Sequence, residues 1–284
     1  MNILNLELSN EYLIKLIQRD KPFMITRVGI GAETYISAKY KVTNKIEQSL
    51  LNSLDNNNGI YASNKNQLIN WCGHYIKSIE ESNALATWEN AVIKEQKILK
   101  PNGIPSIHTR VLEPFYLCSE NIKPWSHYLQ GKKILIISPF VDSIKSQNET
   151  DFQLFSDDRR IFLDDQEFVY YKAYNTSAGN HAHDNWNETF DIMCDEISKL
   201  DFDVALLGCG GYGLPLCRYI KKSLNKSVIY IGGGLQMVFG VMGKRWEQSE
   251  YWKKMIQIHN PKLIRPRGDE VLKNCHKVEN ACFW

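Results

Sequence analysis

The sequence predicts an α/β protein built on a Rossmann-like, mostly parallel sheet, with helices on both faces and a helical insertion in its N-terminal half. Three observations predict this class. Val204 to Leu207 is a short apolar run that ends at a glycine turn and precedes an amphipathic helical pattern from Leu214 to Lys222. Val228 to Ile231 repeats the strand-then-glycine pattern, which completes a βαβ unit. Lys133 to Pro139 is a continuous apolar run, typical of a strand buried on both faces of a parallel sheet.

The composition fits one large α/β domain or two modest ones. The 284 residues are 43% hydrophobic and 23% charged, as in an ordinary globular protein. A formal net charge of +2 argues against a general nucleic-acid-binding protein, which carries a strong basic surplus. The chain has no run of apolar residues long enough for a membrane span, and its seven cysteines are scattered without a CxxC pair. We therefore expect a cytoplasmic protein with reduced thiols and no signal peptide.

Before residue 130 the pattern predicts mainly helices. Apolar positions at helical spacing predict a first helix over residues 10–20, and Phe23 to Val28 has the composition of a strand. The other elements predicted here are helices over residues 42–54, 66–82 and 83–99 and a short strand over residues 104–111. A boundary between two lobes is predicted near residue 130, where a Gly-Lys-Lys turn precedes the clearest strand of the chain.

After residue 130 the pattern predicts alternating strands and helices. A weakly patterned helix follows the strand that begins at Lys133, Phe168 to Ala173 predicts another strand, and Trp186 to Leu200 predicts a helix with one apolar stripe. We expect residues 1–246 to form one Rossmann-like domain of two lobes. The aromatic tail, residues 247–284, is expected to pack on this body or on a partner subunit.

The glycine turns after the predicted strands form the first candidate binding site, because parallel sheets place ligands at the carboxyl ends of their strands. The spacing of Gly208, Gly210 and Gly213 satisfies the dinucleotide fingerprint, but Gly232 stands where a ribose-binding acid would usually follow. A redox dinucleotide, another phosphate-bearing ligand and glycines that only permit tight turns stay open as interpretations, with the second favoured. The substrate-binding residues predicted in these turns are Gly208, Gly210, Gly211, Tyr212, Gly232, Gly233, Gly234 and Gln236.

A second candidate site is the strand-to-glycine junction that contains Arg27, Gly29, Gly31 and Glu33. An arginine at a strand end can hold a phosphate by a bidentate pair, and the carboxylate of Glu33 can act as a base or orient a sugar hydroxyl. The alternative interpretation is an Arg–Glu ion pair that stabilises the turn. Later in the chain, Lys244 and Arg245 add positive charge that is predicted to fold over a diphosphate at the start of the helix beginning at Leu235.

A polar loop over residues 174–186 supplies further candidates. His181 and His183 are two residues apart, which in an extended segment places them on one face, with Asp184 adjacent. General acid or base catalysis or a phosphate contact by one histidine, a metal pair, and a simple cap on the next helix are the alternatives. Asp142, after the strand that begins at Lys133, is a further residue expected to meet a ligand.

The order of these signatures resembles bacterial glycosyltransferases of the GT-D fold over roughly residues 20–245. The resemblance implies a single α/β domain that moves a sugar from a nucleotide-sugar donor to a glycan or lipid-linked acceptor in surface polysaccharide synthesis, as in capsule formation. The motifs that carry it are Arg27-Val28-Gly29-x-Gly31-x-Glu33, Gly131-Lys132-Lys133-Ile134-Leu135-Ile136-Ile137, the strand from Asp203 to Gly208, and Ile231-Gly232.

One departure from the family pattern concerns metal. The pattern has an acidic-x-acidic pair that holds a divalent cation, whereas here Ile30 replaces the first acid and only Glu33 remains, displaced by one residue. A lone carboxylate is a poor site for a hard divalent cation, so no metal or other cofactor is firmly predicted.

The predicted activity is that of a glycosyltransferase, with the base drawn from Glu33, His181, His183 and Asp142. Two other classes stay open: a different nucleotide-dependent enzyme on a Rossmann-like sheet, and a non-catalytic partner in a glycan-assembly complex. The sequence also leaves open peripheral association with a membrane and a homo-oligomer.

Overall fold

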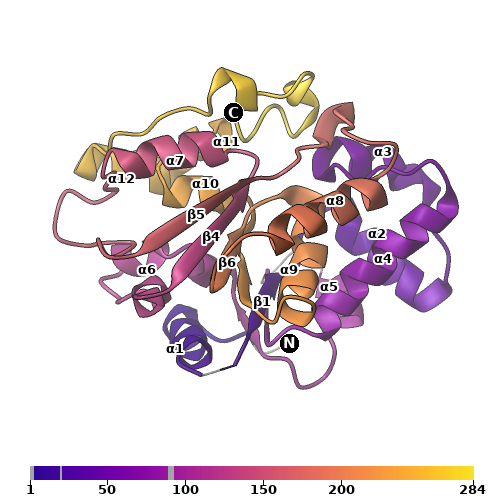
Figure 1. Ribbon diagram of the computed structural model, residues 1–284, viewed down its shortest axis with the longest axis horizontal. Helices are drawn as coiled ribbons and strands as arrows, with labels where there is room; N and C mark the ends of the chain where they lie inside the picture. The colour runs from indigo at the N-terminus through magenta and orange to yellow at the C-terminus, as the bar shows by residue number, and fades with distance from the viewer. Residues whose placement is uncertain (1–2, 20, 89–92) are drawn as a thin grey trace.

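The computed structural model describes residues 3–19, 21–88 and 93–284, and its centre is a seven-stranded sheet in the order β3-β2-β1-β7-β6-β4-β5 (Figure 1). Every pair of neighbouring strands is parallel. The predicted α/β class with a Rossmann-like sheet is therefore confirmed. The strands are β1 (Met24–Arg27), β2 (Ala84–Thr87), β3 (Ser106–His108), β4 (Lys133–Ser138), β5 (Glu167–Lys172), β6 (Val204–Leu207) and β7 (Ser227–Tyr230).

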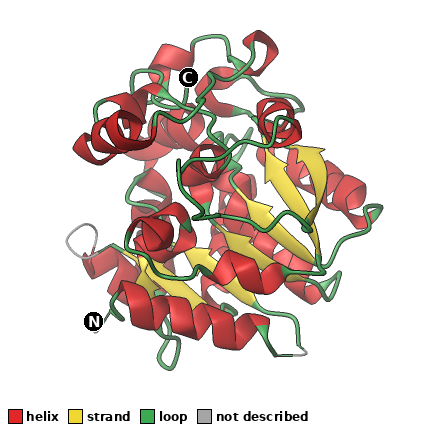
Figure 2. Ribbon diagram, turned by 90° about the vertical axis from the view of Figure 1, so that its left-hand side faces the viewer, coloured by secondary structure: helices red, strands yellow, loops and turns green. Residues whose placement is uncertain are grey.

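Helices cover both faces of this sheet (Figures 1 and 2). One apolar cluster joins the sheet to α1 (Leu6–Ile17), α6 (Phe115–Ser119), α7 (Val141–Glu149), α10 (Leu235–Val238), α11 (Lys244–Glu247) and α12 (Glu250–His259). A second cluster, on the opposite face, joins it to α2 (Ala32–Thr43), α4 (Lys65–Glu80), α5 (Ile93–Leu99), α8 (Trp186–Ser198) and α9 (Gly213–Lys222). The short α3 (Leu51–Ser53) lies between α2 and α4 in the chain.

The two clusters explain why the central strands are apolar without alternation. In β6, Val204 and Leu206 belong to the first cluster, whereas Ala205 and Leu207 belong to the second. All four residues are fully buried. A strand that packs against helices on both faces needs apolar side chains at every position, and this need produces the continuous runs seen in the sequence.

The prediction of a helix over residues 83–99 is wrong in its first part. Ala84–Thr87 forms β2, which pairs with β1 on one side and β3 on the other and is buried throughout. α5 is described from Ile93 to Leu99, and residues 89–92 lie outside the described part, as does Asp20 of the first predicted helix. Alanine and leucine favour helices, but pairing with two neighbours and burial on both faces override that preference.

One other expectation about the N-terminal half is also corrected. The predicted polar helix over residues 42–54 is instead the end of α2 followed by short helical turns, the last of them a π-helical turn at Leu54–Asn58. The half before residue 130 is mainly helical, as predicted, and it also supplies β1, β2 and β3. Since β1 pairs with β7, the two halves build one continuous sheet.

The tail after residue 246 packs on the body. Trp252 of α12 is fully buried in the first cluster, and Val278 and Cys282 are also buried. Glu270, 4% exposed, accepts hydrogen bonds from the backbone N–H groups of Asp142 and Ser143 at the start of α7. A carboxylate at a helix N-terminus is favoured by the helix dipole, so this contact holds the tail to the sheet edge. None of the helices in the described part of the chain is long and apolar enough to cross a membrane.

Candidate functional site

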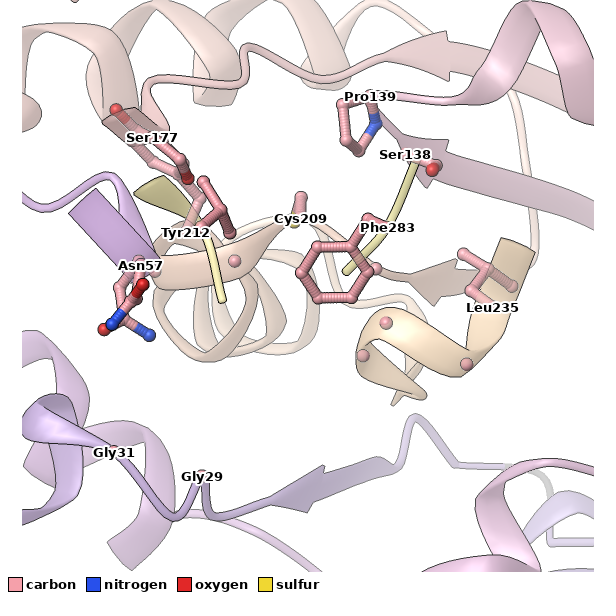
Figure 3. Close-up of a pocket in the computed structure, with 18 of the residues that line it drawn as sticks. Gly29, Gly31, Asn57, Ser138, Pro139, Ser177, Cys209, Tyr212, Leu235 and Phe283 are labelled. Carbon is pink, nitrogen blue, oxygen red and sulfur yellow. The ribbon is translucent and has the colours of Figure 1, made fainter. Parts of the chain in front are cut away.

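A cavity of about 710 Å³ lies at the carboxyl ends of the central strands. Its wall includes the turns that follow β1, β4, β6 and β7. Figure 3 shows Gly29, Pro139 and Cys209 from these turns and Leu235 at the start of α10 around it. The chain leaves β1 toward α2 on one face and leaves the neighbouring β7 toward α10 on the other. Ligands of open parallel sheets bind where successive connections diverge in this way.

Three strand-end residues that the sequence marks as candidates, Arg27, Gly208 and Gly232, all line this cavity. Arg27, at the end of β1, donates a hydrogen bond from Nη1 to the carbonyl oxygen of Ile231 after β7, at 2.7 Å. Its guanidinium carbon lies 5.4 Å from the centre of the Trp88 ring. Because two neighbouring strand ends and an aromatic ring fix this guanidinium, its position is set before any ligand arrives.

Glu33 lies in the first turn of α2 and is 9% exposed. Its Oε2 atom has no hydrogen-bond partner among the described residues. Burial raises the pKa of this carboxyl above its ordinary value, while the N–H groups of Glu33 and Gly31, the Asn58 side chain and the charge of Arg27 lower it in part. A carboxyl group with a raised pKa and an unpartnered oxygen in a cavity is suited to proton transfer.

The glycine turns differ in how much room they leave for a ligand. Gly210 and Gly232 have φ values of 56° and 79°, in the left-handed region that glycine tolerates best. A Cβ on Gly208 would lie 2.6 Å from the carbonyl oxygen of Gly232, so glycine there lets the two turns pack closely. A Cβ on Gly233 would lie 2.5 Å from the ring of Phe283. The tail therefore covers the β7 turn. Gly210 and Gly211 lie in the other turn, which leads from β6 into α9.

A second buried carboxylate in the cavity, Glu113, is missed by sequence reasoning. It precedes α6 in a loop, where no strand end or glycine motif marks it. Its side chain is 17% exposed, and its Oε1 lies 3.9 Å from Nη1 of Arg27. Burial raises the pKa of Glu113, and the charges of Arg27, Arg110 and Arg245 lower it in part. Arg27 thus acts electrostatically on two acidic side chains of the same cavity.

Four predicted site residues do not line the cavity: His181, His183, Asp142 and Lys244. His181 stacks on Tyr61 and pairs through Nε2 with Asp55 at 2.8 Å. His183 contacts the hydroxyl of Thr189 through Nδ1 at 3.0 Å, and Asp142 pairs with Lys172 at 2.5 Å. The side chains of His181, His183 and Asp142 therefore each have a polar partner outside the cavity.

The remaining predicted residues do line the cavity: Gly29, Gly31, Gly208, Gly210, Gly211, Tyr212, Gly232, Gly233, Gly234, Gln236 and Arg245. Gln236 is 1% exposed, and its Nε2 donates to the carbonyl oxygens of Val241 and Phe283, both at 3.0 Å. Arg245 lies over the Phe283 ring, 4.7 Å from its centre, and pairs with Glu279. The helix N-terminus expected after the triple glycine is only the four-residue α10, whose approach is occupied by Phe283 and Glu113.

The comparisons with known proteins add no assignment. No family model matches the chain, and no curated protein matches it either. Within residues 3–19, 21–88 and 93–284, no group of three or more His, Cys, Asp or Glu side chains is placed to hold a metal ion.

Proposed function

We propose that the protein is a glycosyltransferase that moves a sugar from a nucleotide-sugar donor to a hydroxyl group of a glycan or lipid-linked acceptor. The observation that carries the proposal is the convergence of Arg27, Glu33 and the β6 and β7 glycine turns on one cavity. The cavity volume of about 710 Å³ falls within the range of roughly 300–1,000 Å³ that is usual for small-molecule sites.

The cavity offers both kinds of group that a nucleotide sugar needs. Positive charge comes from Arg27 and from Arg245 in α11, and backbone N–H groups come from the turn that starts α9. Carboxylates come from Glu33 and Glu113, and aromatic rings from Trp88, Tyr116 and Trp246. A diphosphate is expected against the cations and the α9 turn, and the sugar against the carboxylates.

In the proposed reaction, the oxygen of the acceptor hydroxyl forms a bond with the anomeric carbon of the donor sugar. The bond from that carbon to the diphosphate oxygen breaks, and the hydroxyl proton moves to the carboxylate of Glu33. Its raised pKa makes Glu33 a stronger base than an exposed carboxylate. Arg27 and the α9 turn stabilise the charge that develops on the leaving diphosphate.

The test is a panel of nucleotide sugars incubated with the purified protein, with products identified by mass spectrometry. We expect release of a nucleoside diphosphate with at least one donor, both with added Mg²⁺ or Mn²⁺ and with a chelator. Glu33→Gln should lower turnover by roughly 10²–10⁴-fold while nucleotide binding persists. Stabilisation by NAD or S-adenosylmethionine in thermal unfolding, with no effect of any nucleotide sugar, would contradict the proposal.

A further inference from the structure

The two acidic side chains of the cavity share one packing arrangement. A Cβ on Gly29 would overlap the Glu33 carboxylate, and a Cβ on Gly31 would lie 2.6 Å from its Oε2. On the other side of Arg27, a Cβ on Gly234 would overlap Oε1 of Glu113. Each carboxylate thus lies in space that a glycine leaves free. The turn after β7 leaves room for the carboxylate of Glu113, as the turn after β1 leaves room for that of Glu33.

Glu113 is half-buried, and in the described part of the chain its one ion pair is a long one with Arg27. Its carboxylate makes no hydrogen bond with any residue of the described part of the chain, and its nearest cation, Nη1 of Arg27, is 3.9 Å away and already donates to Ile231. A carboxylate that is largely shielded from water and accepts no hydrogen bond from the protein is unfavourable, and its presence calls for an explanation. A ligand bound in the cavity that Glu113 lines can supply the hydrogen-bond donors that its carboxylate lacks.

The polar atoms of the cavity that lack hydrogen-bond partners indicate what kind of ligand can pair with them. Among the described residues of the cavity, the Oε2 atom of Glu33 and the Oε1 atom of Gln236 are buried acceptors without hydrogen-bond partners, whereas Nε1 of Trp88 is a buried donor without one. Acceptors therefore outnumber donors. A phosphate carries only acceptors, but a sugar carries several hydroxyl donors. Tyr116 and Trp88 also line the cavity and supply aromatic surface against which the apolar face of a sugar can pack.

We propose that Glu113 binds hydroxyl groups of the donor sugar and thereby sets which sugar the protein accepts. This inference rests on the proposed function and adds the sugar subsite to it. The subsite lies between Arg27, Gly234 and Tyr116. Glu113 acts there as a hydrogen-bond acceptor in the ground state, while Glu33 takes the proton of the acceptor.

The test compares the affinity for a nucleotide sugar with that for its own nucleoside diphosphate. The probes are UDP-glucose, UDP-galactose, UDP-N-acetylglucosamine and GDP-mannose against UDP and GDP, titrated calorimetrically into the full chain. In the wild type, the preferred nucleotide sugar should bind more tightly than the nucleotide alone. In Glu113→Ala this preference, the ratio of the affinity for the nucleotide sugar to that for the nucleotide, should fall by about tenfold to a hundredfold, the effect of removing a hydrogen bond to a charged group.

Two further variants keep the test independent of folding defects. Gly234→Ala leaves Glu113 in the chain but displaces its carboxylate, and it should reduce the same preference. Gly73→Ala, where an added Cβ meets nothing within 4 Å, should leave the preference intact. A general loss of folding would instead weaken sugar and nucleotide binding together.

The outcomes separate the two proposals. If no nucleotide sugar binds to the wild type, the proposed function fails, and the inference that rests on it fails as well. If a nucleotide sugar binds but folded Glu113→Ala and Gly234→Ala keep the wild-type preference for it, the proposed function stands and the role of Glu113 is overturned.

Discussion

The carboxylate of Glu33 occupies the space that a side chain at Gly29 would need. The two residues are four positions apart, on either side of the start of α2, and the turn between them brings the carboxylate back over the end of β1. A substitution at Gly29 therefore acts on Glu33 without changing its chemistry. This relationship provides a way to test the position of the carboxylate separately from its identity.

Gly29→Ala should lower turnover about as much as Glu33→Gln does, by roughly 10²–10⁴-fold, because the displaced carboxylate no longer reaches the acceptor hydroxyl. The measurement is the rate of nucleoside diphosphate release with the donor found in the panel. Gly73→Ala is the matched control. Full activity of a folded Gly29→Ala variant would remove Glu33 from the proposed mechanism.

Arg27→Lys should weaken binding of a nucleoside diphosphate by about tenfold or more, because lysine cannot reproduce a planar, bidentate contact. A lysine at this position also loses the guanidinium contact with the Trp88 ring. Titration calorimetry with UDP and GDP measures the effect. Arg159→Lys, which alters an ion pair with Asp157 outside the cavity, serves as the control. Equal loss in both variants would argue against a phosphate contact by Arg27.

Glu113→Gln should change the pH dependence of stability. Burial raises the pKa of Glu113 above its ordinary value. A carboxyl group whose pKa is higher in the folded than in the unfolded chain stabilises the fold while it is protonated, and this contribution is lost as the pH rises through the folded-state pKa. Glutamine does not ionise, so the variant does not lose this stability as the pH rises.

The midpoint of thermal unfolding should therefore be higher for Glu113→Gln than for the wild type at about pH 8, with a difference that shrinks toward about pH 4. Thermal unfolding followed by circular dichroism over this range measures it. A difference between the two proteins that is the same at every pH would show that the ionisation of Glu113 does not affect folding.

Glu270→Ala should destabilise the fold by about 2 kcal/mol or more, because it leaves the N–H groups of Asp142 and Ser143 at the start of α7 without their acceptor. Denaturant unfolding measures this free energy. Glu247→Ala, which removes an exposed ion pair with Arg265, should change stability by less than about 1 kcal/mol. Equal effects of the two substitutions would contradict the capping role of Glu270.

The sequence predicts the part of the site that lies at strand ends. Arg27, Glu33 and the glycine turns could be found because apolar runs mark parallel strands, and the carboxyl ends of parallel strands meet at one edge. His181 and His183 also follow a strand, β5, but their loop turns them toward Tyr61 and Thr189. The direction of a long polar loop depends on tertiary contacts that a local pattern does not contain.

Local sequence patterns did not predict the position of Glu113 or the strand β2, for related reasons. Glu113 enters the cavity from a loop that is defined by its packing rather than by a motif, and the sequence there shows only an acidic residue before Pro114. In β2, four residues of mixed propensity become a strand only because β1 and β3 lie on both sides of it. Both features depend on partners that are distant in sequence.

The pairing of β1 with β7 has a consequence for experiments that divide the polypeptide. A cut near residue 130 would leave Arg27 on one fragment and the carbonyl of Ile231, its hydrogen-bond acceptor, on the other. Neither piece would then carry all the residues that line the cavity. Studies of binding and activity accordingly require the uncut molecule, or two fragments that reassemble along this seam.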